Sequence, residues 1–210
     1  MSLRVLSETV SPFAENTFFV FDDETKAAII VDPGDEADRL FGVVEEHGLN
    51  VERILLTHGH IDHVGAVPAM RRRTGAEVWM HPGDEFLLDG LKAQAELLGL
   101  RPPEEQPVID HALAEGDVFP FAGGEIRVFE TPGHSPGSVT LDFGELLVAG
   151  DVLFAGSIGR TDLPGGDHDQ LLKTIRERLF VYPDKTIVYP GHGPSTTIGR
   201  EKRQNPFFAV

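Results

Sequence analysis

The feature that most constrains this chain is a dense run of potential metal ligands at residues 58–63, HGHIDH, which directly follows the short apolar run 53–56. In a turn that leaves a strand, alternate side chains can point into one pocket, and the start of the following helix can present further side chains there. Such a segment can contribute to two adjacent metal sites. A solvated loop with surplus histidines is the alternative, but four ligand-type side chains within six residues favour metal binding.

The composition restricts both the ligands and the partners of such a site. The 210-residue chain contains no cysteine, so a metal must be held by histidines and carboxylates, and cysteine nucleophiles and disulfides are excluded. The formal charge of −16 argues against nucleic acid and anionic lipid as partners. Residues 1–21 lack the basic start and unbroken apolar run of a signal peptide, and no stretch reaches transmembrane length. We therefore expect a cytoplasmic protein with no nucleic-acid or membrane partner.

The rest of the chain repeats one theme, a short apolar run that ends in a turn carrying His or Asp. These runs are typical of buried strands and occupy residues 27–31, 53–56, 125–129, 145–148 and 186–189. Further strands are expected at 3–10 and 16–21, and amphipathic helices at 36–47, 62–73, 84–98 and 169–180. The alternation predicts an α/β fold in a single domain, residues 1–210. We expect two mixed sheets packed face to face, helices outside and the ligand-bearing turns along one edge.

Four residues outside the 58–63 segment are further candidates for the site. His134 and His192 each follow a Pro-Gly pair at the end of an apolar run, which fixes a turn that presents one imidazole. Taken alone, each could equally be an exposed turn histidine. Asp151 ends an apolar run, where a carboxylate needs a partner or a metal unless it caps a helix. Asp32, in an Asp-Pro-Gly turn, is either a simple turn residue or a carboxylate that orients a ligand histidine.

Five segments, taken together, resemble a known family. They are THGHIDHVGA (57–66), TPGHSPGS (131–138), AGDVLF (149–154), GSIGRTDLPGG (156–166) and VYPGHGPSTTIGREKRQNPF (188–207). The resemblance is to the metallo-β-lactamase superfamily, and within it to the compact glyoxalase II-like (hydroxyacylglutathione hydrolase-like) thioester hydrolases. It runs in order over nearly the whole chain, and it implies the αβ/βα sandwich of that superfamily.

The resemblance also implies how the ligands divide between two metal ions. Three histidines would bind one ion, an aspartate and two histidines would bind the other, and a further aspartate would bridge the two. By this resemblance the first ion would be bound by His58, His60 and His134, and the second by Asp62, His63 and His192. The bridging aspartate would be Asp151.

The donor set indicates both the metal and the chemistry. Two divalent ions that share a carboxylate suit Zn²⁺ best, with Fe and Mn as alternatives. A water bridging such ions would give hydroxide near neutral pH, which would attack a thioester carbonyl and release a thiolate. We expect His58, His60 and Asp62 to be required for this catalysis, and no covalent nucleophile is needed.

The loop 154–162 is the first candidate for substrate contact. Arg160 could bind a substrate carboxylate, with Asp162 beside it, and the alternative is a surface ion pair between these two side chains. Glutathione-specific members of the family look to carry Lys and Tyr in this loop and to add a C-terminal helical region. This chain has Arg160 and Asp162 in that loop, and the resemblance to the family implies a small-molecule thioester of the S-2-hydroxyacylglutathione type as substrate. The acyl group, the thiol carrier and the presence of a homo-oligomer stay open.

Other functions on the same fold are less favoured. A persulfide dioxygenase would use mononuclear iron bound by His58, His134 and Asp151, and it resembles this chain in the GRTD segment. The intact Pro-Gly-His turn at His192 instead favours a complete set of ligands for a second metal ion, and therefore hydrolysis. An exported β-lactamase would bring a signal peptide, and a nuclease would bring a basic face. A purely structural metal site would form a closed coordination shell, whereas seven ligands over two ions leave positions for water.

Overall fold

The computed structural model describes residues 3–208, and its first sheet contains six strands in the order β1-β2-β3-β4-β5-β6. Neighbours from β1 to β3 pair antiparallel, and neighbours from β3 to β6 pair parallel. The strands are β1 Leu3–Val10, β2 Glu15–Asp22, β3 Ala27–Val31, β4 Asn50–Leu55, β5 Glu77–Met80 and β6 His111–Ala112. The sheet is therefore mixed, as the sequence predicts.

The second sheet also has six strands, in the order β14-β13-β10-β9-β8-β7. Strands β10 and β13 pair parallel, and the other neighbours pair antiparallel. The strands are β7 Val118–Phe121, β8 Gly124–Glu130, β9 Val139–Asp142, β10 Leu146–Gly150, β13 Ile187–Pro190 and β14 Thr196–Thr197. A short hairpin, β11 Leu153–Phe154 and β12 Ser157–Ile158, follows β10.

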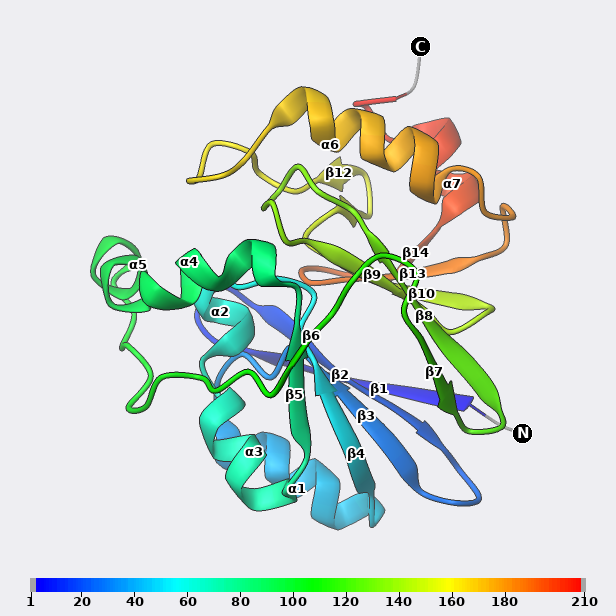
Figure 1. Ribbon diagram of the computed structural model, residues 1–210. Helices are drawn as coiled ribbons and strands as arrows, with labels where there is room; N and C mark the ends of the chain where they lie inside the picture. Colours follow the sequence, from blue (N-terminus) through cyan, green and yellow to red (C-terminus); the bar gives the residue numbers. More distant parts are fainter. Residues whose placement is uncertain (1–2, 209–210) are drawn as a thin grey trace.

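The two sheets pack face to face around one apolar layer (Figure 1). In this layer Phe18, Ile29 and Leu55 of the first sheet belong to the same buried cluster as Ile126 and Leu141 of the second. Because strand side chains alternate between faces, the other face of each sheet is free to bind helices.

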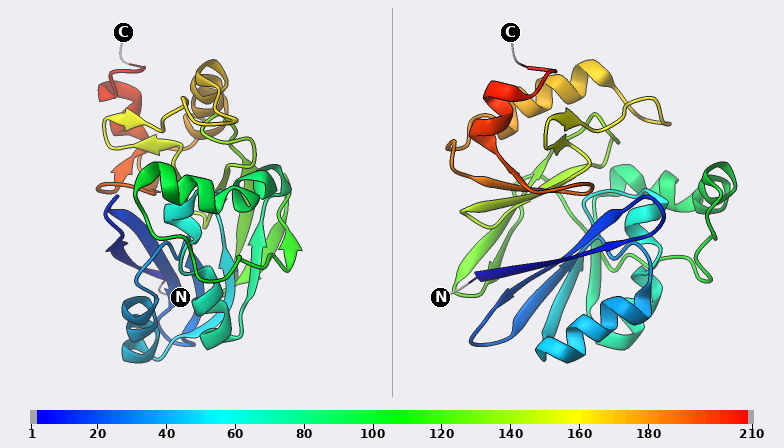
Figure 2. Two further views of the ribbon diagram at one scale, coloured as in Figure 1. Left: turned by 90° about the vertical axis from the view of Figure 1, so that its left-hand side faces the viewer. Right: turned by 180° about the vertical axis from the view of Figure 1, so that it is seen from behind.

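Helices cover the outer faces of both sheets (Figure 2). Leu40 and Met70 belong to the cluster on the outer face of the first sheet, and Leu171 and Ile198 belong to the one on the outer face of the second. The helices are α1 Ala37–His47, α2 Ile61–Val64, α3 Val67–Thr74, α4 Glu85–Asp89, α5 Leu91–Leu98, α6 His168–Thr174 and α7 Ile198–Gln204. Among residues 3–208, no helix combines the length and the apolar character that a membrane crossing requires.

The sequence predicts one continuous helix at 62–73 and another at 84–98, and both predictions are wrong because each helix is divided in two. Pro68 lies near the start of α3, and in an unbroken helix its ring would clash with the carbonyl of Val64, so the helix divides at this point. Gly90 divides the second helix, where it ends α4 and begins α5. The helix at 169–180 begins at His168 and ends in a π-helical turn, Ile175–Leu179.

Candidate metal centre

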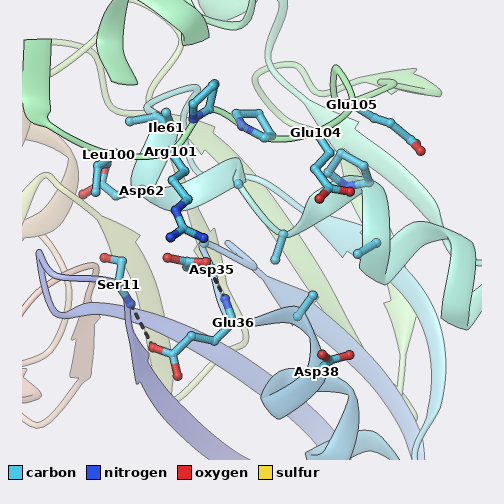
Figure 3. Close-up of a pocket in the computed structure, with 18 of the residues that line it drawn as sticks. Ser11, Asp35, Glu36, Asp38, Ile61, Asp62, Leu100, Arg101, Glu104 and Glu105 are labelled. Carbon is cyan, nitrogen blue, oxygen red and sulfur yellow. Dashed lines mark hydrogen bonds between the residues drawn. The ribbon is translucent and has the colours of Figure 1, made fainter. Parts of the chain in front are cut away.

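A groove of about 960 Å³ opens beside the turn between β4 and α2 (Figure 3). Its lining comes from three parts of the chain: the β1–β2 turn with the start of α1, the segment from α2 to α3, and the loop 99–105 after α5. Asp62 lines this groove and is also one of the predicted metal ligands. The groove therefore adjoins the cluster of ligand-type side chains.

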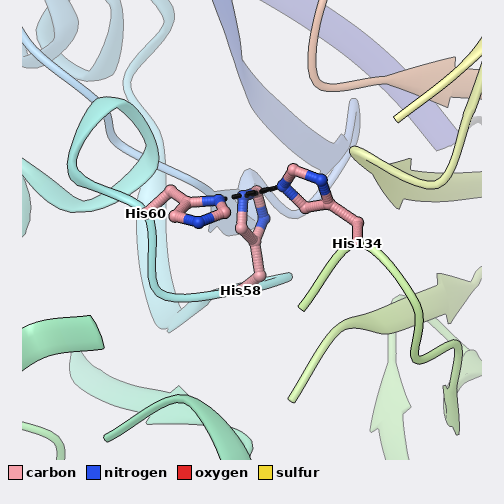
Figure 4. Close-up of side chains that lie close together, drawn as sticks. All are labelled: His58, His60 and His134. Carbon is pink, nitrogen blue, oxygen red and sulfur yellow. Dashed lines mark hydrogen bonds between the residues drawn. The ribbon is translucent and has the colours of Figure 1, made fainter. Parts of the chain in front are cut away.

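Three histidines from two turns converge on one point. His58 and His60 come from the turn after β4, and His134 comes from the turn between β8 and β9 (Figure 4). The Nε2 atom of His134 lies 2.9 Å from Nδ1 of His60 and 3.3 Å from Nε2 of His58. Nitrogens bound to one zinc ion at about 2.0–2.1 Å in tetrahedral geometry would lie roughly 3.3 Å apart, so the spacing suits a single ion.

A second group forms next to the first. Ligand atoms of Asp62, His63 and His192 all lie within 4.8 Å of one another. Asp151 lies between the groups: its Oδ1 is 3.4 Å from Nε2 of His63, and its Oδ2 is 3.7 Å from Nε2 of His134. The structure thus brings together all seven predicted ligands, with one carboxylate facing both groups.

Hydrogen bonds on the far side of the rings fix three of these histidines. The Nδ1–H of His134 donates to the carbonyl oxygen of Arg160 at 2.7 Å, and that of His192 donates to the carbonyl oxygen of Phe13 at 3.0 Å. A carbonyl oxygen only accepts, so Nδ1 carries the proton in both rings. The Nδ1 of His63 lies 3.0 Å from the Asp32 carboxylate. The Nε2 atoms are left to face the centre of the cluster, as in many metal sites.

Asp32 supports two histidines at once. Its carboxylate accepts hydrogen bonds from the backbone N–H and the hydroxyl of Thr57, at 2.7 and 2.5 Å, in addition to the bond from His63. The Thr57 oxygen in turn lies 3.1 Å from Nδ1 of His58. Ligand atoms of Asp32, His58 and His63 also lie within 4.8 Å of one another, but the carboxylate contacts Nδ1 of His63, whereas Nε2 of that ring faces Asp151. This contact is the one that an orienting carboxylate would make, and the orienting role of Asp32 stays a prediction.

The pKa values in the cluster are shifted because imidazoles and carboxylates are buried close together. Burial lowers the pKa of His60 to about 3, which keeps this ring neutral. Burial also acts to lower the pKa values of His63 and His192, but contacts with Asp151 outweigh it and raise them, that of His192 to about 9. Burial acts to raise the pKa of Asp151, but the charge on His63 outweighs it and holds this pKa well below its usual range. The raised pKa values of the two imidazoles and the lowered pKa of Asp151 both mean that positive charge is favoured beside this carboxylate.

Unpaired atoms at the centre show that the residues fit a metal. Nε2 of His63 and Oδ1 of Asp151 are buried and have no hydrogen-bond partner within residues 3–208, although they face one another at 3.4 Å. Buried polar atoms without partners are rare and costly. A cation between these two atoms would satisfy both of them, so the donor set is suited to divalent metal ions.

Asp84 is a residue that the sequence assigned only to the start of a helix. Its buried side chain makes no helix-cap bond; instead it accepts hydrogen bonds from Gly59 N–H at 3.0 Å, Gly137 N–H at 2.6 Å and the Ser135 hydroxyl at 2.6 Å. A Cβ at Gly137 would lie 2.7 Å from the Asp84 nitrogen, so the segments are in close backbone contact. Asp84 therefore ties the turn carrying His58 and His60 to the turn carrying His134.

Asn16 is a second residue that sequence reasoning missed. From the start of β2 its side-chain amide donates to the carbonyl oxygens of Pro190 and Gly193, at 3.1 and 2.8 Å, and its backbone N–H donates to Gly191. These bonds hold the turn that carries His192. The signal in the sequence is weak because the partners are more than 170 residues away.

The predicted substrate contacts Arg160 and Asp162 bind each other. The guanidinium donates from Nε and Nη2 to the two carboxylate oxygens at 2.7 and 2.8 Å, on an exposed part of the loop. The two side chains are not part of the lining of the groove beside Asp62. The backbone of Arg160, through its bond to His134, has the closer link to the cluster.

The C-terminal segment supports the loop that follows Asp151. The side-chain amide of Asn205 donates to the carbonyl oxygen of Ser157 at 2.9 Å, and the buried carboxylate of Glu201 accepts from Gly156 N–H at 2.8 Å. The GREKRQNPF segment is therefore connected to the site through this loop.

Comparison with known proteins agrees with this geometry. The family model of the metallo-beta-lactamase superfamily matches residues 10–192. The chain belongs to the metallo-beta-lactamase superfamily. Within the superfamily it is 44% identical over 207 residues to hydroxyacylglutathione hydrolase GloC of Haemophilus influenzae, with 94% of each chain covered. The expected fold class is therefore correct.

Solved structures of the superfamily are also similar. The crystal structure of BLEG-1 B3 metallo-beta-lactamase has a TM-score of 0.92 at 39% identity, covering 99% of this chain and 100% of that one. TTHA1623 in a di-iron-bound form has a TM-score of 0.87 at 39% identity, covering 96% and 99%. ETHE1 from Myxococcus xanthus has a TM-score of 0.80 at 30% identity, covering 100% and 85%. These superfamily members carry different names, so the substrate must be argued from the site.

Proposed function

We propose that this metallo-hydrolase cleaves thioesters of the S-2-hydroxyacylglutathione type with two divalent metal ions. The observation that carries the proposal is the arrangement of seven ligand-type side chains in two adjacent groups, with Asp151 facing both. The similarity to a relative named hydroxyacylglutathione hydrolase supports the substrate class.

The side chains have separate tasks in this proposal. One ion is held by His58, His60 and His134. The other ion is held by Asp62, His63 and His192, and Asp151 is shared between the two ions. When bound, the ions lower the pKa of a water molecule and polarise the substrate carbonyl. The hydrogen bonds to the Nδ1 atoms keep the imidazoles in one tautomer and one orientation, so little ordering is left to occur when the metal binds. We propose that His58, His60 and Asp62 are essential to catalysis.

The identity of the metal is part of the proposal. Histidine nitrogens and carboxylate oxygens suit zinc, iron and manganese alike, and we propose zinc as the first choice. The di-iron form of TTHA1623 supports iron as the main alternative. Reconstitution with each metal, followed by metal analysis, will decide between them.

The test is hydrolysis of S-D-lactoylglutathione by protein that has been stripped of metal and reloaded with Zn²⁺, Fe²⁺ or Mn²⁺. We expect two ions per chain and activity that returns only with metal. His60→Ala should abolish the activity, while circular dichroism shows that the chain stays folded. Full activity after thorough metal removal would refute the proposed function. Nitrocefin cleavage, measured in parallel, checks for β-lactamase activity, which the name of BLEG-1 suggests.

A persulfide dioxygenase is the second candidate because of the similarity to ETHE1. It would place one iron on His58, His134 and Asp151. The second group of ligands, close to the first and sharing Asp151, favours two ions and hydrolysis. One iron per chain together with oxygen uptake on glutathione persulfide would establish this alternative in place of hydrolysis.

A further inference from the structure

The groove beside Asp62 contains one arginine that differs from the others. Four arginines line it, and three of them are bound by carboxylates of the chain. The pairs are Arg39 with Glu8 and Glu36, Arg72 with Glu105, and Arg73 with Asp38. Arg101 makes no ion pair and no side-chain hydrogen bond with any residue from 3 to 208. Its donors are therefore available to a ligand.

The backbone holds Arg101 in a fixed place. Helix α5 ends at Gly99, which has φ of +69°, and the N–H of Leu100 donates to the carbonyl of Ala95 at 2.9 Å. The half-buried Leu100 packs against the core cluster, and Pro102 follows Arg101 directly. A residue before proline is restricted to extended conformations. The guanidinium is thus attached to a rigid segment, which lowers the entropy cost of binding a ligand.

The position of Arg101 suits a group on the substrate. Its side chain extends into the groove toward Asp35, and Asp62 lines the same groove (Figure 3). Asp62 belongs both to the groove and to the metal cluster, so a ligand held at the Asp62 end of the groove would adjoin the cluster. Acidic side chains such as Asp35 and Glu36 would repel an anionic substrate, so binding one requires a local positive charge. Arg160, the other candidate, is already bound to Asp162.

We propose that Arg101 is the residue that binds a carboxylate of the substrate, and that the groove holds the anionic half of the thioester. The planar guanidinium presents a fork of donors that matches a carboxylate. This inference rests on the proposed thioesterase function and adds to it a preference for anionic thioesters over neutral ones.

The experiment compares two thioesters of lactate on the metal-loaded enzyme. S-D-lactoylglutathione carries carboxylates on its thiol half, and S-lactoyl-N-acetylcysteamine carries none. Arg101→Gln should raise KM for the glutathione thioester about tenfold, the size expected for loss of one charge-assisted hydrogen bond, while kcat stays nearly constant. KM for the neutral thioester should not change. Arg101→Lys, which keeps the charge but loses the fork, should be intermediate.

Arg178→Gln is the control, because that exposed guanidinium is bound to Glu115 at 2.9 Å and is not part of the groove lining. It should leave both substrates unaffected. An unchanged KM for the glutathione thioester in Arg101→Gln, or an equal loss for both thioesters, would overturn the inference. If the wild-type enzyme hydrolysed neither thioester, the proposed function would fail. Calorimetric titration with S-hexylglutathione would then decide the role of Arg101: weaker binding to Arg101→Gln supports it, and equal or absent binding refutes it.

Discussion

Three of the candidate metal ligands, His63, His134 and His192, have a partner behind the ring that holds them in place. Asp32 and the carbonyl groups of Arg160 and Phe13 bind single imidazoles, whereas Asp84 binds the backbone on both sides of the cluster. Asp84 therefore sets the distance between the two turns that supply the three-histidine group. A change at this residue should alter the metal site without removing any ligand.

We predict that Asp84→Asn weakens metal binding by about 10- to 100-fold, as is usual for partners behind metal ligands. Asparagine keeps the shape of the side chain. In the wild type a backbone N–H donates to each carboxylate oxygen, so in the variant the NH₂ group would face one of these N–H groups and two donors would oppose one another. The mismatch should move the two turns apart. Metal affinity, measured by competition with a chromophoric chelator, is the readout.

The control for this prediction is Asp142→Asn. Asp142 is also a buried carboxylate, and it accepts hydrogen bonds from Gly144 N–H at 2.7 Å and the Tyr182 hydroxyl at 2.8 Å. Each variant leaves buried donors poorly paired, so both should lose about 1–3 kcal/mol of stability. Asp84→Asn alone should lose metal affinity, and equal affinity in both variants would refute the positioning role.

At the residue level, the sequence predicted the ligands better than their supports. The seven candidate ligands lie in short segments whose composition is informative by itself, such as HGHIDH and the Pro-Gly-His turns. Asp84 and Asn16 act through partners that are distant along the chain, and no local pattern distinguishes them from ordinary turn residues. Arg160 was predicted as a substrate contact because its loop follows Asp151, with an ion pair to Asp162 as the alternative, and the structure has that ion pair.

Among the secondary-structure elements, the strand ends position the site. The turns after β4, β8, β10 and β13 carry the ligands, and they meet at one edge of the sandwich because two of these strands lie in adjacent, parallel positions. The turn after β8 also touches α6: a Cβ at Gly133 would lie 2.4 Å from Cα of Leu171, and Asp167 N–H donates to the Gly133 carbonyl at 2.8 Å. Helix α6 therefore supports the turn that presents His134.

We predict that Gly133→Ala destabilises the fold and displaces His134. Gly133 has φ of +134°, so a side chain strains the backbone, and its methyl group would also collide with α6. Together these effects should cost about 2–4 kcal/mol. Urea unfolding gives the stability, and metal analysis after dialysis should find less than the two ions per chain expected for the wild type.

Gly144→Ala separates the two causes. Gly144 has φ of +90°, but a Cβ there would have no atom within 4 Å. This variant should lose only the backbone part, about 1–2 kcal/mol, and should keep its metal. Equal losses of stability and of metal in the two variants would contradict the role given to α6.

The elements themselves were predicted to different degrees. Strands followed from apolar runs bounded by Gly and Pro, and the run 27–31 coincides with β3. The helix breaks at Pro68 and Gly90 were missed because the apolar periodicity continues across them. The short strands β11, β12 and β14, two residues each, have no periodicity that could reveal them.

At the scale of the whole molecule, the two sheets share both a core and a metal centre. The buried layer between them contains residues of each sheet, and the candidate ligands come from each as well: His58 follows β4 of the first, and His134 and Asp151 follow strands of the second. A metal ion in this place would connect the two halves. The pairing order within each sheet could not be read from the sequence, because it depends on contacts between distant strands.

We predict that the chain unfolds as a single cooperative unit, which is the behaviour expected if residues 1–210 form one domain. The chain provides a spectroscopic probe in each sheet. Its one tryptophan, Trp79, lies in β5 of the first sheet and contacts Phe119 of the second. Of its two tyrosines, Tyr189 lies in β13 of the second sheet and contacts Phe18 of the first, and Tyr182 stacks on Phe129 of the second. Tryptophan fluorescence and tyrosine absorbance should give the same urea midpoint because neither sheet can keep its inner face buried without the other. Metal removal should lower both midpoints together, because the free energy of unfolding falls by about 2.7 kcal/mol relative to protein at a free metal concentration 100-fold above Kd. An earlier transition for either probe would show that the sheets unfold separately and that the shared apolar layer does not unite them.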